Sequence, residues 1–171
     1  AAVALAPDTP LLGLAGGLET ARWLVWLGVL LFLFRRIAGP RGRRFGLVLA
    51  AVGLLAGGVA TLGLLGPADQ PIAESLGLFA LLARLGLALL VVLVAENLFR
   101  TADEAERWHV ALPAIALGAL SAFDVLLYAD AVLSRGVSSA LLDARAALTA
   151  VATPLLAIAA VRDTRWRRDP P

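Results

Sequence analysis

Residues 45–66 read FGLVLAAVGLLAGGVATLGLLG, a run without a single charged side chain. An α-helix needs about 20 consecutive apolar residues to cross the hydrocarbon core of a bilayer. Pro67 follows the run directly, and proline is typical of a helix boundary because it has no backbone N–H to donate. This stretch therefore predicts a transmembrane helix, and it sets the class of the chain.

The composition of the whole chain agrees with that class. Of its 171 residues, 60% are hydrophobic and 16% are charged, compared with about 45–50% and about 25% in soluble domains. All basic residues are arginine and the net charge is +2, but the arginines are scattered between apolar runs. They do not form the basic patch of a nucleic-acid-binding protein. We therefore expect a lipid bilayer around the chain and no nucleic-acid partner.

Four further segments are long and apolar enough to be transmembrane helices. The sequence thus predicts an all-α fold, a polytopic membrane helix bundle of about five transmembrane helices. Their expected bounds are approximately 14–36, 45–66, 74–98, 109–133 and 137–161. We expect residues 1–171 to form a single transmembrane domain, and we expect the chain to be a fragment of a longer protein.

The arginines predict how the helices are oriented. Short loops rich in arginine stay on the cytoplasmic side of a membrane. One alternating set of loops and ends carries only Arg135. The other set carries Arg35, Arg36, Arg41, Arg43, Arg44, Arg100, Arg107, Arg162, Arg165, Arg167 and Arg168. This asymmetry predicts a multi-pass protein whose C-terminus lies in the cytoplasm.

Charged residues within the predicted spans are the candidates for a functional site, since placing each in hydrocarbon costs about 2.5 kcal/mol or more. At ~1.5 Å of rise per residue, Arg84, Asp124 and Arg145 all fall in the outer half of the membrane. Opposite charges at similar depth on neighbouring helices should pair, and Tyr128 follows Asp124 by one turn. We predict a buried polar cluster of Arg84, Asp124, Tyr128 and Arg145, which either fixes helix packing or takes part in detecting a signal or ligand. The charged residues nearer the interfaces are Glu19, Arg22, Glu96 and Asp130.

The residue inventory does not assemble a catalytic, cofactor or metal site. The chain has no cysteine, and His109 is its only histidine. A zinc site of the usual kind needs several such ligands. No phosphate-binding Walker loop and no Ser/His/Asp set is present in the sequence. We therefore expect no catalytic residue, no cofactor and no metal in this chain.

Several short motifs after residue 95 form a known pattern. They are Glu96-Asn97-Leu98-Phe99-Arg100, Glu106-Arg107-Trp108, Phe123-Asp124, Leu127-Tyr128-Ala129-Asp130, Ala144-Arg145 and Pro154-Leu155-Leu156-Ala157. Residues 96–162 resemble the N-terminal membrane region of PrsK-type sensor histidine kinases, from the PEP-CTERM/exosortase system of exopolysaccharide-producing bacteria. Before Glu96 the likeness is mainly one of hydropathy.

The resemblance implies the sensory input domain of a two-component histidine kinase in the bacterial inner membrane. In that family a cytoplasmic GAF domain and a kinase core follow, and the parent protein would act as a homodimer with a response regulator as its partner. Neither the phosphoacceptor histidine nor the ATP-binding domain occurs in residues 1–171. Two other classes of function remain open: a small transporter or channel subunit that uses the buried charges, and a structural membrane subunit.

Overall fold

The computed structural model describes residues 10–65 and 71–168, which are helical except for short links. The helices are α1 (Pro10–Leu65), α2 (Pro71–Thr101), α3 (Glu104–Ser134) and α4 (Ser139–Arg168). Within the described residues, five segments are long and apolar enough to cross a membrane. They are Gly16–Ala38, Arg44–Leu62, Ser75–Thr101, Val110–Ser134 and Ser139–Ala159. The chain is therefore a multi-pass helical membrane protein, which confirms the predicted fold class.

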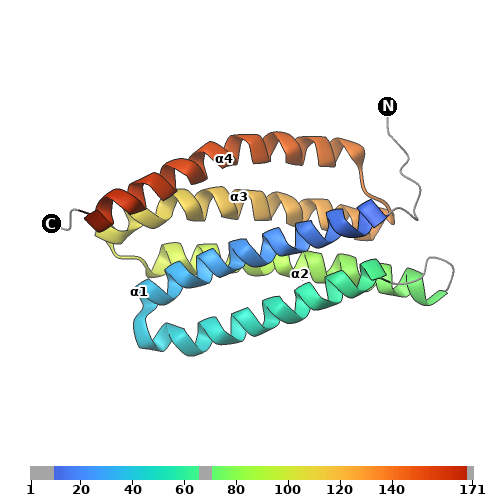
Figure 1. The fold of residues 1–171 in the computed structure, drawn as a ribbon, viewed down its shortest axis with the longest axis horizontal. Coiled ribbons are helices and arrows are strands. Elements are labelled where there is room, and N and C mark those ends of the chain that lie inside the picture. Colours follow the sequence, from blue (N-terminus) through green and yellow to red (C-terminus); the bar gives the residue numbers. More distant parts are fainter. Residues whose placement is uncertain (1–9, 66–70, 169–171) are drawn as a thin grey trace.

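Helix α1 contains two of these five spans because its backbone doubles back on itself (Figure 1). The reversal lies between Ala38 and Arg44, a segment that includes Pro40. Proline removes a helical hydrogen bond and is a common cause of sharp bends. Gly42 sits in this bend, and a Cβ there would collide with Ala38 and press on the Phe34 ring. The bend therefore depends on a residue without a side chain at this position.

The two arms of α1 pack closely against each other and against α2. Gly53 in the second arm leaves room for Leu27 of the first, and Leu90 of α2 reaches the same point. The buried face of the first arm continues through Trp23, Leu27, Leu30 and Phe34. The spacing of four, three and four residues is that of one helix face. The face of α2 that meets it has the same spacing and consists of Leu87, Val91, Val94 and Leu98.

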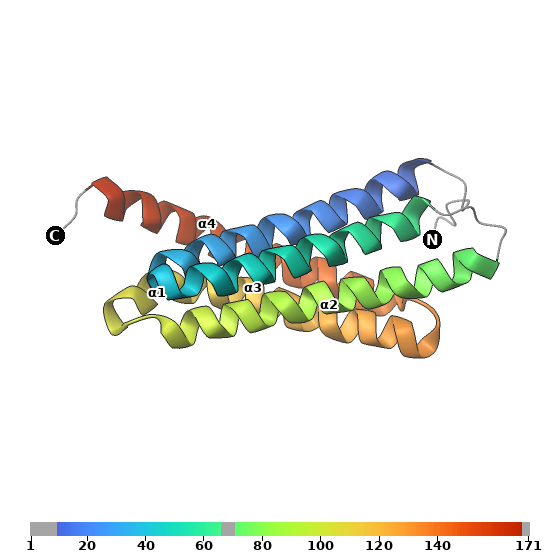
Figure 2. The same ribbon diagram turned by 90° about the horizontal axis from the view of Figure 1, so that it is seen from below.

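Helices α2 and α3 form an antiparallel pair, joined by a link of two residues (Figure 2). Across this pair, a Cβ at Gly118 would lie 3.7 Å from the Cβ of Ala95, so these two positions are level. The link is tight because Arg107 Nε donates to the carbonyl of Ala102 over 3.0 Å. At the other end of α3, Arg135 adopts a positive φ of 53° and turns the chain into α4.

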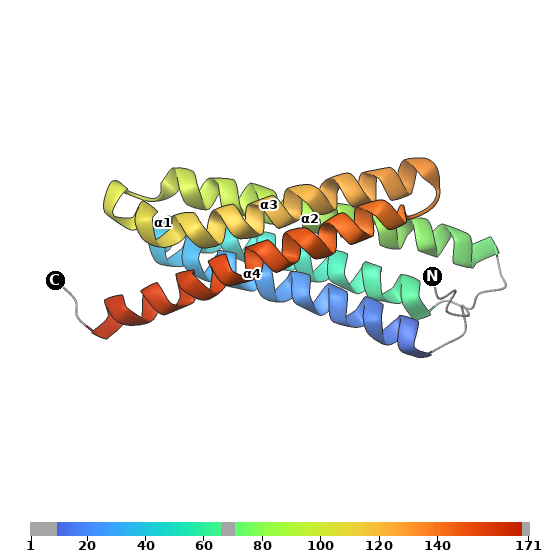
Figure 3. The same ribbon diagram turned by 90° about the horizontal axis from the view of Figure 1, so that it is seen from above.

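Helix α4 is the most loosely held element among those described. It packs along α3 and crosses the bundle obliquely, and its C-terminal end diverges from the other helices (Figure 3). Only 6% of its span is buried, against 22–44% for the other four spans. The apolar contact between α3 and α4 is a small cluster around Ala116, Leu120 and Ala152. Hydrophobic packing alone thus gives α4 little to hold it in one position.

Candidate functional site

Arg145 of α4 forms a two-point ion pair with Asp124 of α3. Its Nε lies 2.6 Å from Asp124 Oδ1, and its Nη2 donates to Asp124 Oδ2 over 2.9 Å. The Asp124 side chain is only 2% exposed and that of Arg145 is 13% exposed. The contact between Nη2 and Oδ2 is a hydrogen bond, and hydrogen bonds between ionised partners are about twice as strong as neutral ones. This pair fastens α4 to α3 inside the apolar bundle.

The same guanidinium also reaches α1. Arg145 Nη2 lies 2.5 Å from Glu19 Oε1. Tyr128, one turn after Asp124 on α3, donates its hydroxyl to the same Glu19 oxygen over 2.9 Å. Glu19 therefore accepts from both α3 and α4. Because α1 and α4 have no close backbone contact in the described residues, this oxygen is their main polar connection.

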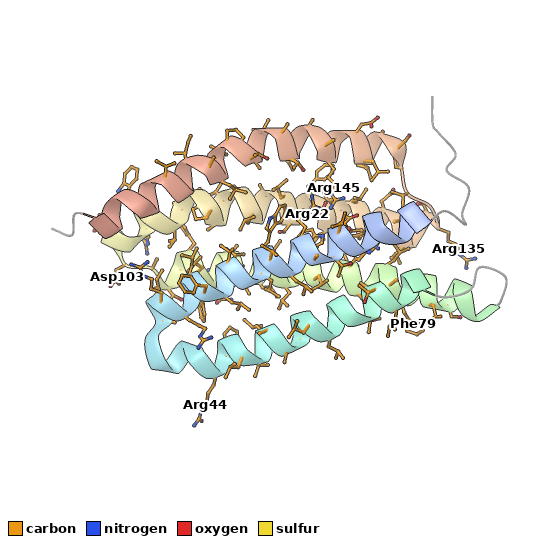
Figure 4. The ribbon with its side chains drawn as sticks, in the orientation of Figure 1. Arg22, Arg44, Phe79, Asp103, Arg135 and Arg145 are labelled. Atoms are coloured by element: carbon orange, nitrogen blue, oxygen red, sulfur yellow. The ribbon has the colours of Figure 1, made fainter. Side chains whose placement is uncertain are left out.

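Arg22 completes the cluster from one turn further along α1. Its Nη2 lies 3.6 Å from Glu19 Oε1 and 3.9 Å from Asp124 Oδ2. The guanidinium carbon lies 4.8 Å from the ring centre of Trp26 and 5.8 Å from that of Trp23. Cations are attracted to the faces of indole rings at such distances. Figure 4 shows Arg22 and Arg145 together between α1 and α4.

We call the five side chains of Glu19, Arg22, Asp124, Tyr128 and Arg145 the ion-pair cluster. It contains two guanidinium groups and two carboxylates, so it is electrically balanced. Buried charges are tolerated when they are paired and hydrogen-bonded, whereas removing one partner strands the other at a high cost. The arrangement can hold three helices together, and it can exchange partners, because each carboxylate lies within 4 Å of both arginines.

Three of the four residues expected at the site lie together in the structure. Asp124 and Arg145 pair directly, and Tyr128 joins them through Glu19. Arg84 is not with them, and it makes no ion pair or hydrogen bond among the residues that the structure describes.

The place of α2 in the bundle explains why Arg84 lies outside the cluster. Since Ala95 is level with Gly118, Asp124 is level with residue 89 of α2. Arg84 then lies five residues, or ~7.5 Å, nearer the outer end of the bundle than Asp124. The contacts of Leu27 and Leu90 at Gly53 place it level with Glu19 and Arg22, so depth alone does not exclude it. Arg84 belongs to α2, however, which does not contact α4 in the described residues.

Glu19 and Arg22 belong to the cluster in the structure, whereas the sequence predicted Arg84 there. Their position in the opening turns of a span suggested that they lie near the interface, outside the cluster. One signal was available, namely that the two residues stand three apart and can pair on one helix face. The sequence does not reveal that α1 places this face beside α3 and α4.

The described residues contain no group of three or more His, Cys, Asp or Glu side chains arranged to hold a metal ion. The side chain of His109 lies outside the described part of the structure. Within the ion-pair cluster, Arg22 Nε and Asp124 Oδ1 are buried without a hydrogen-bond partner among the described residues. The cluster forms no nucleophile-and-base pair of the kind used in covalent catalysis. The geometry is that of a set of ion pairs and hydrogen bonds shared by three helices.

No protein-family model, no curated protein and no solved structure gives a significant match to the chain.

Proposed function

We propose that this chain is the membrane-embedded sensory input domain of a two-component histidine kinase. A signal changes how the helices pack, and α4 passes the change to a cytoplasmic kinase core that follows residue 171. The proposal draws on the likeness of residues 96–162 to the membrane region of PrsK-type sensor kinases, and on the way α4 is attached.

The attachment of α4 is the observation that carries the proposal. Its span is 6% buried, and its strongest link to the other helices is Arg145, which binds both Asp124 and Glu19. A charged group in an apolar bundle is costly unless it is paired. Helix α4 is therefore restricted to positions in which Arg145 has a carboxylate partner, and a small set of discrete positions is what a switch requires.

A second pairing state is available within the same cluster. Arg22 already lies 3.6 Å from Glu19 and 3.9 Å from Asp124, both slightly beyond hydrogen-bonding distance. If Arg22 moves onto these carboxylates, the hold on Arg145 weakens and α4 is freed to shift. A signal that binds one pairing state better than the other would move the equilibrium between them.

The length of α4 suits it for output. The helix runs to Arg168, although its apolar span ends at Ala159. The arginine-rich loops predict that this end lies in the cytoplasm. A continuous helix that leaves the membrane on that side transmits a displacement or rotation directly to a domain attached to it.

The first test is to read the coding sequence beyond residue 171, which we expect to encode a histidine kinase core. The second uses that longer protein in native membranes. Arg145→Gln should change the rate of autophosphorylation from ATP several-fold, because α4 loses its fixed position. Arg135→Gln, an exposed arginine in the link before α4, should leave the rate unchanged.

Two outcomes would contradict the proposal. One is a downstream sequence that encodes no kinase. That result would favour a small transporter or channel subunit, or a structural membrane subunit, over a sensory domain. The other is an autophosphorylation rate that does not respond to Arg145→Gln while the variant remains folded. The 171-residue chain by itself should incorporate no phosphate, since it has no nucleotide-binding loop.

A further inference from the structure

An open groove of about 310 Å³ lies between α2 and α3. Its walls are apolar and include Val92, Ala95 and Phe99 of α2 with Ile115 and Gly118 of α3. Phe99 is 42% exposed and Ile115 is 59% exposed, so the groove opens outward from the bundle. An outward-facing surface of a transmembrane span faces lipid. The groove is therefore open to a ligand that reaches it through the bilayer.

The groove covers most of the depth of one leaflet. Arg100, which also lines it, stands one residue before the end of the α2 span at Thr101. Val92 lies eight residues deeper, or ~12 Å along the helix, and half of the hydrocarbon core is about 15 Å thick. Trp108, near the start of α3, is 72% exposed, as is typical of indole rings at the membrane interface. The groove thus matches the depth of one acyl chain in the leaflet at this end.

Two arginines stand at the interfacial end of the groove. Arg100 is exposed, and its Nη2 lies 2.6 Å from Glu96 Oε1. The guanidinium carbon of Arg107 lies 5.9 Å from the ring centre of Phe99, which lines the groove. Arg107 Nε donates to the carbonyl of Ala102, and Arg107 forms no ion pair among the residues that the structure describes. Its charge is therefore available to an anionic group directly outside the groove.

A carboxylate lies about one helical turn further out on the same face of α3. Glu104 is exposed, and it forms no ion pair among the described residues. Glu104 and Arg107 precede Gly118 by 14 and 11 residues, which is close to four and three full helical turns. All three therefore lie on the face of α3 that borders the groove, with Glu104 ~4.5 Å further toward the aqueous side than Arg107. The order from the membrane outward is an apolar groove, a guanidinium and a carboxylate.

This order matches the order of groups in a zwitterionic phospholipid, which presents an acyl chain, a phosphate and then an ammonium group. Arginine binds phosphate through charge-assisted hydrogen bonds, and a carboxylate accepts such bonds from a primary ammonium. The carboxylates of Asp103, Glu104 and Glu106 stand beside Arg107 in the sequence, so this end lacks the cluster of basic residues that selects anionic lipids. A choline group has no N–H to donate to Glu104. The arrangement therefore favours an ethanolamine head group.

We propose that the groove between α2 and α3 binds one molecule of phosphatidylethanolamine from the leaflet at this end of the bundle. One acyl chain lies in the groove, the phosphate contacts Arg107, and the ammonium donates to Glu104. The site lies in the opposite half of the bundle from the ion-pair cluster, and it does not rest on the proposed signalling function.

The test uses the purified chain in dodecyl maltoside, with dioleoyl phospholipids added at increasing mole fraction. Thermal unfolding is followed, since a ligand that binds only the folded state raises the unfolding temperature. Phosphatidylethanolamine should raise it in a saturable way. Phosphatidylcholine and phosphatidylglycerol with the same chains should need several-fold more lipid for half of that effect, because neither has a primary ammonium.

Two variants test the assignment of charges. Glu104→Gln should remove the preference for phosphatidylethanolamine over phosphatidylcholine and leave the response to phosphatidylcholine unchanged. Arg107→Gln should weaken the binding of all three lipids by about tenfold, as expected for the loss of a hydrogen bond between charged groups. Arg44→Gln is the control, because this exposed arginine lies at the same end of the bundle on another helix (Figure 4). It should respond as the unmodified chain does.

A third variant tests the groove itself. A Cβ at Gly118 would make ordinary contact with Ala95, 3.7 Å away, so the rest of a leucine side chain there extends into the groove. Gly118→Leu should therefore weaken the binding of every lipid. Gly58→Leu is the matched control, since a Cβ at this exposed position meets nothing within 4 Å. The exposed positions Glu104 and Arg107 decide the question even if Gly118→Leu does not fold.

The proposal is wrong if no lipid gives a saturable rise, if phosphatidylcholine or phosphatidylglycerol acts as strongly as phosphatidylethanolamine, or if the preference survives in Glu104→Gln. It is also wrong if the chain forms a dimer in detergent that Gly118→Leu abolishes, because a second copy would then occupy the groove. None of these results depends on a kinase activity.

Discussion

Two nitrogen atoms of Arg145 contact the carboxylate of Asp124 and so join α4 to α3 within the apolar bundle. Nε lies 2.6 Å from Oδ1, and Nη2 lies 2.9 Å from Oδ2. The planar fork of arginine matches a carboxylate in a way that the single ammonium of lysine does not. The contact therefore fixes the rotation of α4 as well as its depth. The consequences of this pair can be measured.

Asp124→Asn should destabilise the bundle by about 3–5 kcal/mol, because Arg145 loses its main partner in a buried position. The double change Asp124→Asn with Arg145→Gln should cost less than the sum of the two single changes. In the double variant, Glu19 and Arg22 remain as a neutral pair three residues apart on α1. Unfolding by SDS in mixed micelles measures the free energies, and strictly additive losses would contradict the pairing.

Tyr128→Phe removes one hydrogen bond to a charged acceptor, the 2.9 Å contact with Glu19, and leaves the ring in place. We expect a loss of about 1.5–3 kcal/mol, smaller than that of Asp124→Asn. Thr153→Val is the control, since the exposed Thr153 hydroxyl bonds only to a carbonyl of its own helix. Its effect should stay within about 0.5 kcal/mol. Equal effects of the two changes in the same SDS assay would count against a role for Tyr128.

Two glycines of α1 form a matched pair for testing how its arms pack. A side chain at Gly53 would collide with Leu27, whereas one at Gly58 would meet nothing within 4 Å. Gly53→Leu should therefore destabilise the protein by about 1–3 kcal/mol through overpacking, and Gly58→Leu should be nearly neutral. Both variants gain the same helix propensity, so the difference between them reports packing alone. Thermal unfolding in detergent checks it, and equal stabilities would contradict the close approach of the arms.

The sidedness of the bundle can be tested with single cysteines, because the chain has none of its own. Arg44 and Asp103 lie at one end of the bundle and Arg135 at the other (Figure 4). The arginine distribution predicts that the first end is cytoplasmic. Gly136→Cys should react with a membrane-impermeant maleimide in intact cells, and Arg44→Cys only after permeabilisation. Arg44 is preferable to Gly42, where a side chain would disturb the bend. Labelling of Arg44→Cys from outside would contradict the predicted topology and indicate the opposite orientation.

The number of spans was predictable from the sequence because an apolar run of about 20 residues has no stable alternative to a membrane helix or a buried one. The depth of Asp124 and Arg145 was predictable for a similar reason, since the helical rise is constant. Their pairing follows from depth together with the adjacency of consecutive helices.

The lateral order of the helices was not predictable in this way. Hydropathy treats α2 and α1 alike as neighbours of α3, so it gave no reason to prefer Glu19 and Arg22 over Arg84. The choice depends on which face of α1 meets α3 and α4, and that in turn depends on the bend near Gly42 and on the contact between Gly53 and Leu27. These are matters of side-chain volume at single positions, which average hydropathy does not record.

Asp124 lies within 4 Å of two arginines, Arg22 of α1 and Arg145 of α4, which are synthesised at different times. The chain is synthesised from its N-terminus, so α1 and α3 enter the membrane before α4 exists. Asp124 then has Arg22, 3.9 Å away in the finished bundle, as its available counter-charge. When α4 follows, Arg145 forms the closer, two-point contact, and Arg22 is left against Trp26. Arg22 thus gives Asp124 a counter-charge within 4 Å that does not depend on α4.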